Sequence, residues 1–324
     1  MLFRSDGVEL AEPFIVDLSG RPDAAPRIDA ALAGVSAAVT PEARIPLRIH
    51  AVDDFGIQQL DFEVVAGKSP MRLQPIEGLQ KGQPSFEGIV PLEVPPLKLQ
   101  PGGSLELTVV ARDASPGAKE RPGRSEPFRF EIVTAEELLS RLAVRELNLR
   151  QRFEQTVREI QGVRRSLEEL RSAPGPADRL AVEAQWIQLR KNANETGGVG
   201  LEFRAVLQEM IHNRVTTTRL LERIEQGVVL PLEQASTEEF PDADRRLERL
   251  REQIDGPDRA AALDQSLASV DRVLARCDAI LKGMLKLESF NEVVTMLRSI
   301  LTEQQGLNEK TRQQRRKQVM ELLK

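Results

Sequence analysis

The stretch that decides the fold is residues 258–306, DRAAALDQSLASVDRVLARCDAILKGMLKLESFNEVVTMLRSILTEQQG. Its apolar residues follow one another at steps of four and three. Such a repeat lays a continuous apolar seam along one face of a helix, the pattern of coiled-coil or bundle packing. The members of this seam are Leu263, Leu267, Val270, Leu274, Cys277, Leu281 and Met284.

Further apolar residues widen this seam beyond that of a two-stranded zipper, so the helix is expected to face more than one partner. They are Val273, Ile280, Leu285 and Leu287. An unbroken helix over 258–306 would extend roughly 70 Å, at about 1.5 Å per residue. A helix of this kind is typical of a structural support, and its apolar seam indicates no catalytic or binding activity.

An earlier helix is expected after Thr134, where the hydrophobic period changes to 3.6 residues. Thr134 is a candidate N-cap, and Glu137 follows at the spacing of a capping box. The helix is expected over 134–172, because Pro174-Gly175-Pro176 then reverses the chain. Its apolar seam comprises Leu139, Leu142, Leu149, Phe153, Ile160, Val163, Leu167 and Leu170.

A second helix is expected over 177–226, with a kink or break at Gly197-Gly198. Within it, Trp186 with Ile187 and Leu180 is interpreted as core packing. The polar Asn213 lies at a seam position of this helix. Two interpretations stay open for Asn213: it fixes the register of the helices, or it lies at a water-exposed edge.

Residues 228–257 are expected to connect the second helix to the last one, with a short helix near 242–254. The helical region is thus assigned to 134–324, ending in a basic segment. It is predicted to be an antiparallel bundle or coiled coil of three long helices. These cover about 134–172, 177–226 and 258–306.

Residues 27–133 are predicted to be an Ig-like antiparallel β-sandwich. Apolar residues alternate with a period of two in 44–53 and 60–64, and Asp53-Asp54-Phe55-Gly56 between them is typical of a turn. Connections are rich in proline, since 15 of the 20 prolines lie before Thr134. Further strands are expected at 86–90, 104–112 and 127–133.

A faint repeat concerns residues 1–18. The sequence FRSDG followed by EPFIV (residues 3–16) resembles ARDAS followed by EPFRF (residues 111–130). We interpret 1–18 as the terminal hairpin of a preceding, truncated sandwich repeat in a longer tandem array. Chance similarity between two turn-rich segments is the alternative.

Composition and charge restrict the classes of function. The formal net charge of −5 is small for 324 residues and argues against bulk binding of nucleic acid. One cysteine excludes an internal disulfide, and Cys277 is expected to be a small buried hydrophobe. Two histidines, His50 and His212, are too few for a familiar zinc or histidine-triad site. We therefore expect no cofactor and no small-molecule substrate.

Calcium is the one metal for which candidate ligands are present. Asp53, Asp54 and Asp113 lie at predicted strand ends, where carboxylates hold calcium between tandem modules of cadherin-like proteins. The competing interpretation is turn chemistry, because aspartate often caps a turn. No set of alternating Asp and Asn ligands accompanies them.

The segment 310–317 is basic but lacks aromatic residues, so it offers no platform for base stacking. A solvated helix end accounts for it better than phosphate or lipid binding. No apolar stretch has the length of a membrane span, and the N-terminus lacks the regions of a signal peptide. The chain as written is therefore expected to be soluble.

Several segments together resemble a large uncharacterised protein family of planctomycete bacteria. They are VTPEARIPL (39–47), DDFGI (53–57), EPF (126–128), TAEELL (134–139), EMIHNRV (209–215) and MLKLESFNE (284–292). Members of that family combine N-terminal membrane helices, Ig-like repeats and a C-terminal helical tail. The resemblance implies that this chain matches the C-terminal part of a larger cell-envelope protein. Its motifs are structural and imply no catalytic residue.

These observations favour a non-enzymatic scaffold or interaction protein. Its partner would be another protein, or a second copy bound through the helices, with membrane contact only through segments outside this chain. A calcium-dependent adhesion or surface-binding module is the alternative. An enzyme with a site between sandwich and bundle ranks third, because no catalytic constellation is visible in the sequence.

Overall fold

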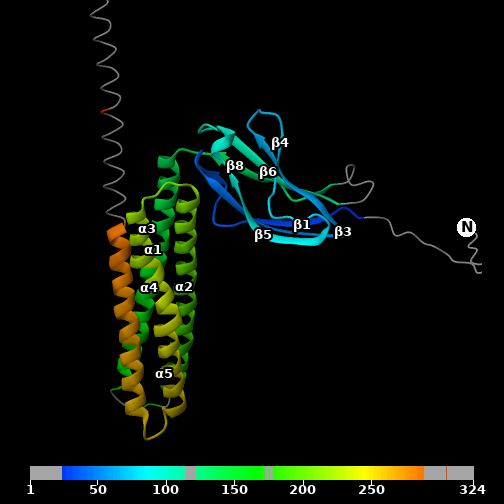
Figure 1. Cartoon of the computed structure of the whole chain (residues 1–324). Coiled ribbons are helices and arrows are strands. Elements are labelled where there is room, and N and C mark those ends of the chain that lie inside the picture. The colour runs from blue at the N-terminus through cyan, green and yellow to red at the C-terminus, as the bar shows by residue number, and fades with distance from the viewer. Residues whose placement is uncertain (1–23, 114–121, 172–174, 176–177, 288–303, 305–324) are drawn as a thin grey trace, which may run out of the picture.

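In the computed structural model, a mixed β-sheet region precedes a helical region (Figure 1). The structure describes residues 24–113, 122–171, 175, 178–287 and 304. The predicted hairpin 1–18 and the basic segment 310–317 lie outside the described residues. Among the helices of the described part, none has the length and apolar content needed to span a membrane.

The sheet follows the strand order β1-β3-β6-β8-β2, with β4 and β5 paired to β3 and β7 paired to β6. Every pair is antiparallel except β2 with β8, which corrects the expectation of a purely antiparallel arrangement. The strands are β1 Arg27–Leu32, β2 Ala38–Val39, β3 Arg44–Ala66, β4 Arg72–Pro75, β5 Gln83–Glu93, β6 Ser104–Asp113, β7 Gly123–Arg124 and β8 Phe128–Ile132, with a 3₁₀ turn at Pro95–Leu97.

The strand β3 runs through the predicted turn at Asp53-Asp54-Phe55-Gly56, so that prediction was wrong. Its register shifts between Val52 and Ile57 instead. Gly56 has a φ of 86°, and a Cβ there would lie 2.4 Å from the carbonyl oxygen of Gly82. Only glycine tolerates both conditions, so the turn-like sequence produces an irregularity inside one long strand.

The two halves of β3 pair with different strands but share one hydrophobic core. The first half pairs with β1 and β5, and the second half pairs mainly with β4 and β6. Side chains from both halves are buried in the same cluster, among them Ile45, Leu47, Phe62 and Val64. Both halves of this irregular strand therefore contribute side chains to the same core.

Four helical stretches lie side by side in the described part of the chain (Figure 1). The first two are α1, Ala135–Glu169, and α2, Asp178–His212. The third comprises α3 Thr218–Ile224, a π turn Glu225–Val229, α4 Leu230–Gln234, a second π turn Ala235–Glu239 and α5 Phe240–Gln253. The fourth covers residues 259–287.

Two predicted helix boundaries were wrong. The helix α2 ends at His212 rather than near 226, and 218–253 is one continuous stretch rather than a connection with a short helix. Pro231 and Pro241 each lie two residues after the end of a π turn, in the first turn of α4 and of α5. A wider π turn accommodates a proline ring without ending the helix, which explains the continuity.

The predicted break at Gly197-Gly198 is also absent, because α2 continues through both residues. A Cβ at Gly197 would lie 3.7 Å from Ser236 Oγ, and the Cβ of Leu232 lies 3.4 Å from the position of a Cβ on Gly200. A Cβ at either position would therefore make an ordinary van der Waals contact with the third stretch. Burial of α2 against its neighbours offsets the low helix propensity of these glycines.

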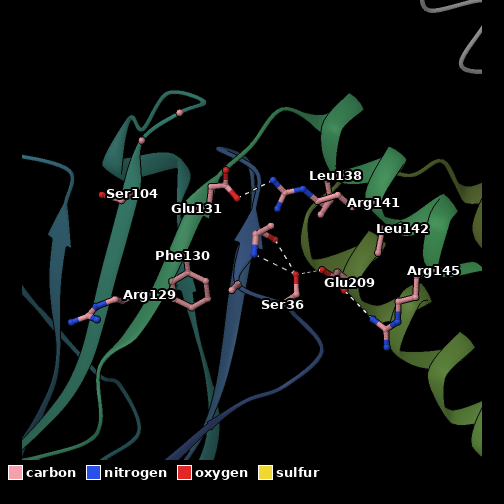
Figure 2. A pocket seen from close by; sticks show the side chains of 14 residues that line it. Ser36, Ser104, Arg129, Phe130, Glu131, Leu138, Arg141, Leu142, Arg145 and Glu209 are labelled. Atoms are coloured by element: carbon pink, nitrogen blue, oxygen red, sulfur yellow. Dashed lines mark hydrogen bonds and ion pairs between the residues drawn. The ribbon is translucent and has the colours of Figure 1, made fainter.

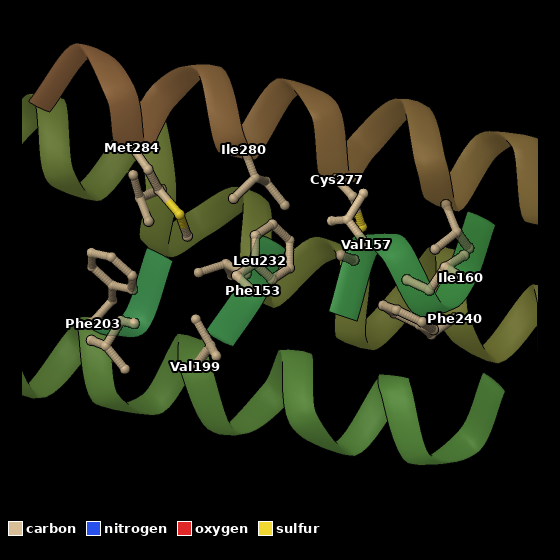
Figure 3. Packing of buried hydrophobic residues seen from close by; sticks show 14 of the residues in the cluster. Phe153, Val157, Ile160, Val199, Phe203, Leu232, Phe240, Cys277, Ile280 and Met284 are labelled. Carbon is tan, nitrogen blue, oxygen red and sulfur yellow. The ribbon is translucent and has the colours of Figure 1, made fainter. Parts of the chain in front are cut away.

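Most residues of the predicted seam are buried in the helical core (Figure 3). The buried face of the helix is nevertheless rotated about the helix axis relative to that seam. Val273 and Ile280 are fully buried, whereas Leu274 is only partly buried. A straight helix has 3.6 residues per turn, so its buried face drifts away from a strict heptad. The same drift buries Leu138 rather than Leu139 in α1.

Two local predictions were confirmed. The Thr134 hydroxyl accepts a hydrogen bond from the Glu137 amide at 3.1 Å, so Thr134 caps α1. Cys277 is fully buried beside Ile280, and this burial raises the pKa of its thiol to about 12. A protonated, inaccessible thiol is not a nucleophile, which fits the interpretation of Cys277 as a small hydrophobe.

Candidate functional site at the junction of sheet and helices

An open groove of about 740 Å³ lies where the β-sheet region meets the helices (Figure 2). One wall comes from β8 and the turn before β2, and the other from the start of α1 and the end of α2. Its polar residues include Ser36, Glu131, Arg141, Arg145 and Glu209. These side chains come from segments far apart in the sequence, so the junction brings them together.

Glu209, which is buried, is the centre of the groove's polar contacts. Ser36 Oγ donates a hydrogen bond to Glu209 Oε1, and Arg145 Nη1 lies 3.5 Å from Glu209 Oε2. Ser36 Oγ also accepts a hydrogen bond from the Ala38 amide at 3.3 Å. A buried carboxylate is tolerated only with such partners, so these contacts fix the turn before β2 against α2.

A second set of contacts joins Thr40 to the end of α2. The Thr40 amide donates to Asn213 Oδ1 at 2.8 Å, and Thr40 Oγ1 donates to the Asn213 carbonyl oxygen at 2.7 Å. Asn213 Nδ2 donates to the Glu209 carbonyl oxygen at 2.9 Å, and both Thr40 and Asn213 are buried. Asn213 thus neither sets helix register nor lies at an exposed edge. It links the two regions.

The rim of the junction carries a charged cluster around Glu93. Arg214 Nη2 lies 2.9 Å from one carboxylate oxygen of Glu93, and Arg44 Nε lies 3.2 Å from the other. Arg214 has a φ of 53°, the left-handed conformation that turns the chain out of α2. Desolvation lowers the pKa of the neighbouring His212, and the positive charge of Arg44 lowers it further.

The charged side chains of the groove are matched in pairs. Arg141 Nη2 lies 2.9 Å from Glu131 Oε2, and Arg129 Nε lies 3.0 Å from Glu106 Oε2. Ser36 is already committed to Glu209, and the described residues that line the groove include no histidine or cysteine. The arrangement can fix an orientation, because the Glu209 carboxylate is held by both the Ser36 hydroxyl and Arg145.

The three candidate calcium ligands occupy different environments. Asp53 is buried, and its Oδ2 accepts a hydrogen bond from the Phe55 amide at 2.9 Å, the pattern of an Asx turn. Asp54 is exposed, whereas Asp113 is buried at the end of β6, where it pairs with Ile57. Within the described ranges, no group of three or more His, Cys, Asp or Glu residues could hold a metal ion.

The prediction of core packing holds for Trp186 but not for Leu180 and Ile187. Trp186 packs against the helical core, with the guanidinium carbons of Arg190 and Arg251 at 5.0 and 4.5 Å from its ring centroid. Leu180 and Ile187, however, are 75% and 57% exposed, so their assignment to the core was wrong. The seam of α2 rotates away from both residues.

The junction residues Glu209, Ser36 and Arg145 were not predicted. A pattern that points to them is present in the segment EMIHNRV (209–215), which supplies Glu209, His212, Asn213 and Arg214 to the junction. Its polar residues interrupt an otherwise apolar helix end. Their partners lie far away in sequence, so the segment alone does not identify the contacts.

Comparisons with known proteins do not identify a family. No protein-family model matches the chain, and no curated protein matches it. A solved structure described as the Br derivative of BhCBM56 aligns with a TM-score of 0.20 and 14% identity, over 35% of this chain and 96% of its own. The structure named pT26-6p aligns with a TM-score of 0.21 and 12% identity, over 86% of this chain and 49% of its own. Similarity at these TM-scores supports no argument about fold or function.

Proposed function

We propose that this chain is a non-enzymatic scaffold or protein-interaction protein that holds a β module at a fixed orientation on a helical arm. The observation that carries the proposal is the buried hydrogen-bond network of Thr40, Asn213, Glu209 and Ser36 at the junction. Flexibly tethered domains share few buried contacts. Here, rotation of one region against the other would break the Thr40–Asn213 and Ser36–Glu209 hydrogen bonds while these groups stay buried, which opposes free rotation.

The proposal includes a finer description of both regions. We infer that the β module is an Ig-like sandwich, because the two halves of β3 pair with different strands and contribute to one core. We infer likewise that the helices form an antiparallel bundle. Ion pairs between neighbours support this, such as Arg164 Nε to Asp271 Oδ1 at 2.6 Å between the first and fourth stretches. A cell-envelope location rests on the family resemblance alone.

A distance measurement across the junction tests the scaffold proposal. Ile89 on β5 and Ala268 on the last helix are exposed, so cysteines placed there can carry spin labels without disturbing either core. The native Cys277 is buried and should remain unlabelled. Pulsed electron paramagnetic resonance should then give one narrow distance distribution.

The same measurement in an Asn213→Ala variant should give a broader distribution, because the link to Thr40 is lost. Thr216→Ala is the matched control, since the Thr216 hydroxyl donates to the carbonyl oxygen of the adjacent Thr217. A broad distribution in the unmodified chain would show that the two regions move independently. The scaffold proposal would then fail.

The calcium-dependent alternative makes a different prediction. Calcium that bridged Asp53, Asp54 and Asp113 would raise the melting temperature as its concentration increased, with the logarithm of the concentration once the site is saturated. We expect no heat in calorimetric titration and no shift at millimolar calcium. A saturable heat that Asp113→Asn abolished would instead favour the adhesion module.

A further inference from the structure

A groove of about 1240 Å³ lies between the third and the fourth helical stretches. One wall comes from α3, the π turn after it and the start of α4, and the other from the last turns of the fourth stretch. Figure 1 shows α3 beside those last turns, which are drawn in orange. Five of the described residues that line the groove are cations, and Glu222 is the one carboxylate among them. We call this surface the basic groove, and its cations are Arg219, Arg223, Arg276, Lys282 and Lys286.

The floor of the basic groove is formed by backbone. A Cβ on Gly283 would lie 2.2 Å from the carbonyl oxygen of Gly227, so the two helices approach each other there through their main chains. Gly227 belongs to the π turn Glu225–Val229, and such widened turns occur frequently at functional sites. Because neither glycine fills the space with a side chain, a depression remains between the longer side chains of the two walls.

The positive charge of the basic groove is only partly neutralised by the chain itself. Arg276, at one end, lies 2.6 Å from Glu239, as many arginines of the helices lie beside a carboxylate of a neighbouring stretch. By contrast, Arg219, Lys282 and Lys286 are exposed, and they form no ion pair within the part of the chain that the structure describes. Carboxylates of a partner can therefore pair with them without breaking an existing contact.

The cations of the basic groove are arranged in two rows. Lys282 and Lys286 are four residues apart, so they lie one turn apart on the same side of the fourth stretch. Arg219 and Arg223 have the same spacing on α3. A ligand with anionic groups along its length can pair with both rows, whereas a single small anion would meet only part of them. Leu285, which is 47% exposed, adds an apolar contact.

The lining favours an acidic peptide over other anionic partners. The volume exceeds the range of about 300–1,000 Å³ that is typical of small-molecule pockets, so it fits a segment of chain. None of the described lining residues is aromatic, so the groove offers no platform for the stacking of nucleic-acid bases. Anionic membranes attract cations on a surface that can lie against the headgroups, whereas these cations line a concave surface.

We propose that the basic groove binds an acidic amphipathic segment of a partner protein. Carboxylates of this segment pair with the two rows of cations, and its apolar side chains contact Leu285. The inference rests on the proposed function, because it names the chemistry of the partner that a scaffold or interaction protein would bind. Peptide affinity and the distance across the junction are separate measurements, so either proposal can fail without the other.

Fluorescence anisotropy of the full chain with a labelled peptide is the first test. The probe is a twelve-residue peptide of glutamates and leucines, spaced so that the two residue types lie on opposite faces of a helix. The parent chain should bind it, and the dissociation constant should increase with salt concentration. Lys282→Glu combined with Lys286→Glu should raise the dissociation constant at least about tenfold.

Arg245→Glu combined with Arg249→Glu is the matched control. These two arginines are exposed, have the same spacing on α5 and lie outside the basic groove. Thermal melting by circular dichroism should show that both double variants are folded. A parent that did not bind the peptide, or an equal loss of affinity in the two double variants, would overturn the proposal.

A change without charge tests whether the peptide enters the groove. Ala279 is exposed and lines the groove, so Ala279→Trp should obstruct it and raise the dissociation constant at least about tenfold. Ala275→Trp is the control, because Ala275 is exposed one turn earlier on the same helix and outside the lining. Equal affinity of these two variants would show that general electrostatic attraction holds the peptide, and the proposal would fail.

Vesicles of phosphatidylglycerol separate an acidic peptide from a membrane surface as the partner. We expect the parent to bind the peptide in preference to the vesicles. Binding of the vesicles that Lys282→Glu with Lys286→Glu abolished, without binding of the peptide, would assign the basic groove to an anionic membrane and overturn the proposal.

Discussion

The junction and the helical interior are both buried, but they are stabilised by different forces. The junction buries polar groups whose hydrogen bonds define one orientation, as in Thr40 with Asn213. The helical interior buries apolar side chains such as Val273 and Ile280, whose packing is strong but not directional. We infer that the interior supplies most of the stability and that the junction supplies the orientation. The predictions below separate the two contributions.

The largest effect is expected from a charge in the helical interior. Val273→Asp would bury an unpaired carboxylate at a fully buried position, so we expect a loss of more than about 4 kcal/mol, enough to unfold the helices. Leu274→Asp should cost less, about 1–2 kcal/mol, because Leu274 is only partly buried. Thermal melting by circular dichroism measures both, and equal losses would show that the buried face follows the strict heptad.

The junction should respond less strongly in stability. Asn213→Ala removes the partner of the Thr40 amide and leaves that donor buried, so we expect a loss of about 3 kcal/mol. Thr216→Ala should stay within about 0.5 kcal/mol of the parent. Urea unfolding measures the difference, and an Asn213→Ala variant as stable as the control would show that water replaces the missing contacts.

The same contrast explains what the sequence could and could not predict. The α1 cap at Thr134 and the burial of Cys277 were predictable, because each depends on residues near in sequence or on a regular helical period. The continuous β3 was not, because the turn pattern at Asp53-Asp54-Phe55-Gly56 forms a strand irregularity only when Gly82 lies against it. Whether this sequence forms a turn or a strand irregularity is therefore decided by its tertiary contact with Gly82.

The candidate site was harder to predict than the fold. Ser36 and Glu209 are 173 residues apart, and so are Thr40 and Asn213. Local sequence motifs do not extend over such a separation, so neither pair could be recognised from the sequence. Leu180 and Ile187 were assigned to the core for a related reason: their spacing has the same period as a core seam, so periodicity alone does not say which face is buried.

Close backbone approach in the helical interior should give an intermediate effect. A Cβ at Gly283 would lie 2.2 Å from the carbonyl oxygen of Gly227 in the first π turn, so Gly283→Ala must push the two helices apart. We expect a loss of about 1–3 kcal/mol. Gly162→Ala in α1 is the matched control, because nothing lies within 4 Å of its Cβ position.

In that control, alanine should stabilise the chain by about 0.5–1 kcal/mol, since it favours the helix and fills open space. Opposite signs for the two glycine-to-alanine changes would locate the cost in the contact between Gly283 and Gly227. If both variants gained stability, the helices would be able to separate at the π turn without loss.

The smallest effect is a pH dependence at the rim of the junction. The pKa of His212 is lowered in the folded state, mainly by desolvation and also by Arg44, so the unfolded chain takes up this proton first. The stabilisation is therefore complete above the ordinary histidine pKa of about 6.5, and it decreases as the pH falls towards the folded-state value. Because the ring is partly exposed, we expect a contribution below about 1 kcal/mol.

Urea unfolding at pH 7.5 and 5.5 should show a larger loss of stability at the lower pH in the parent than in His212→Gln. A His50→Gln variant is the control, because His50 is exposed, and it should behave as the parent does. If His212→Gln lost as much stability as the parent, protonation of His212 would not be what weakens the junction at low pH.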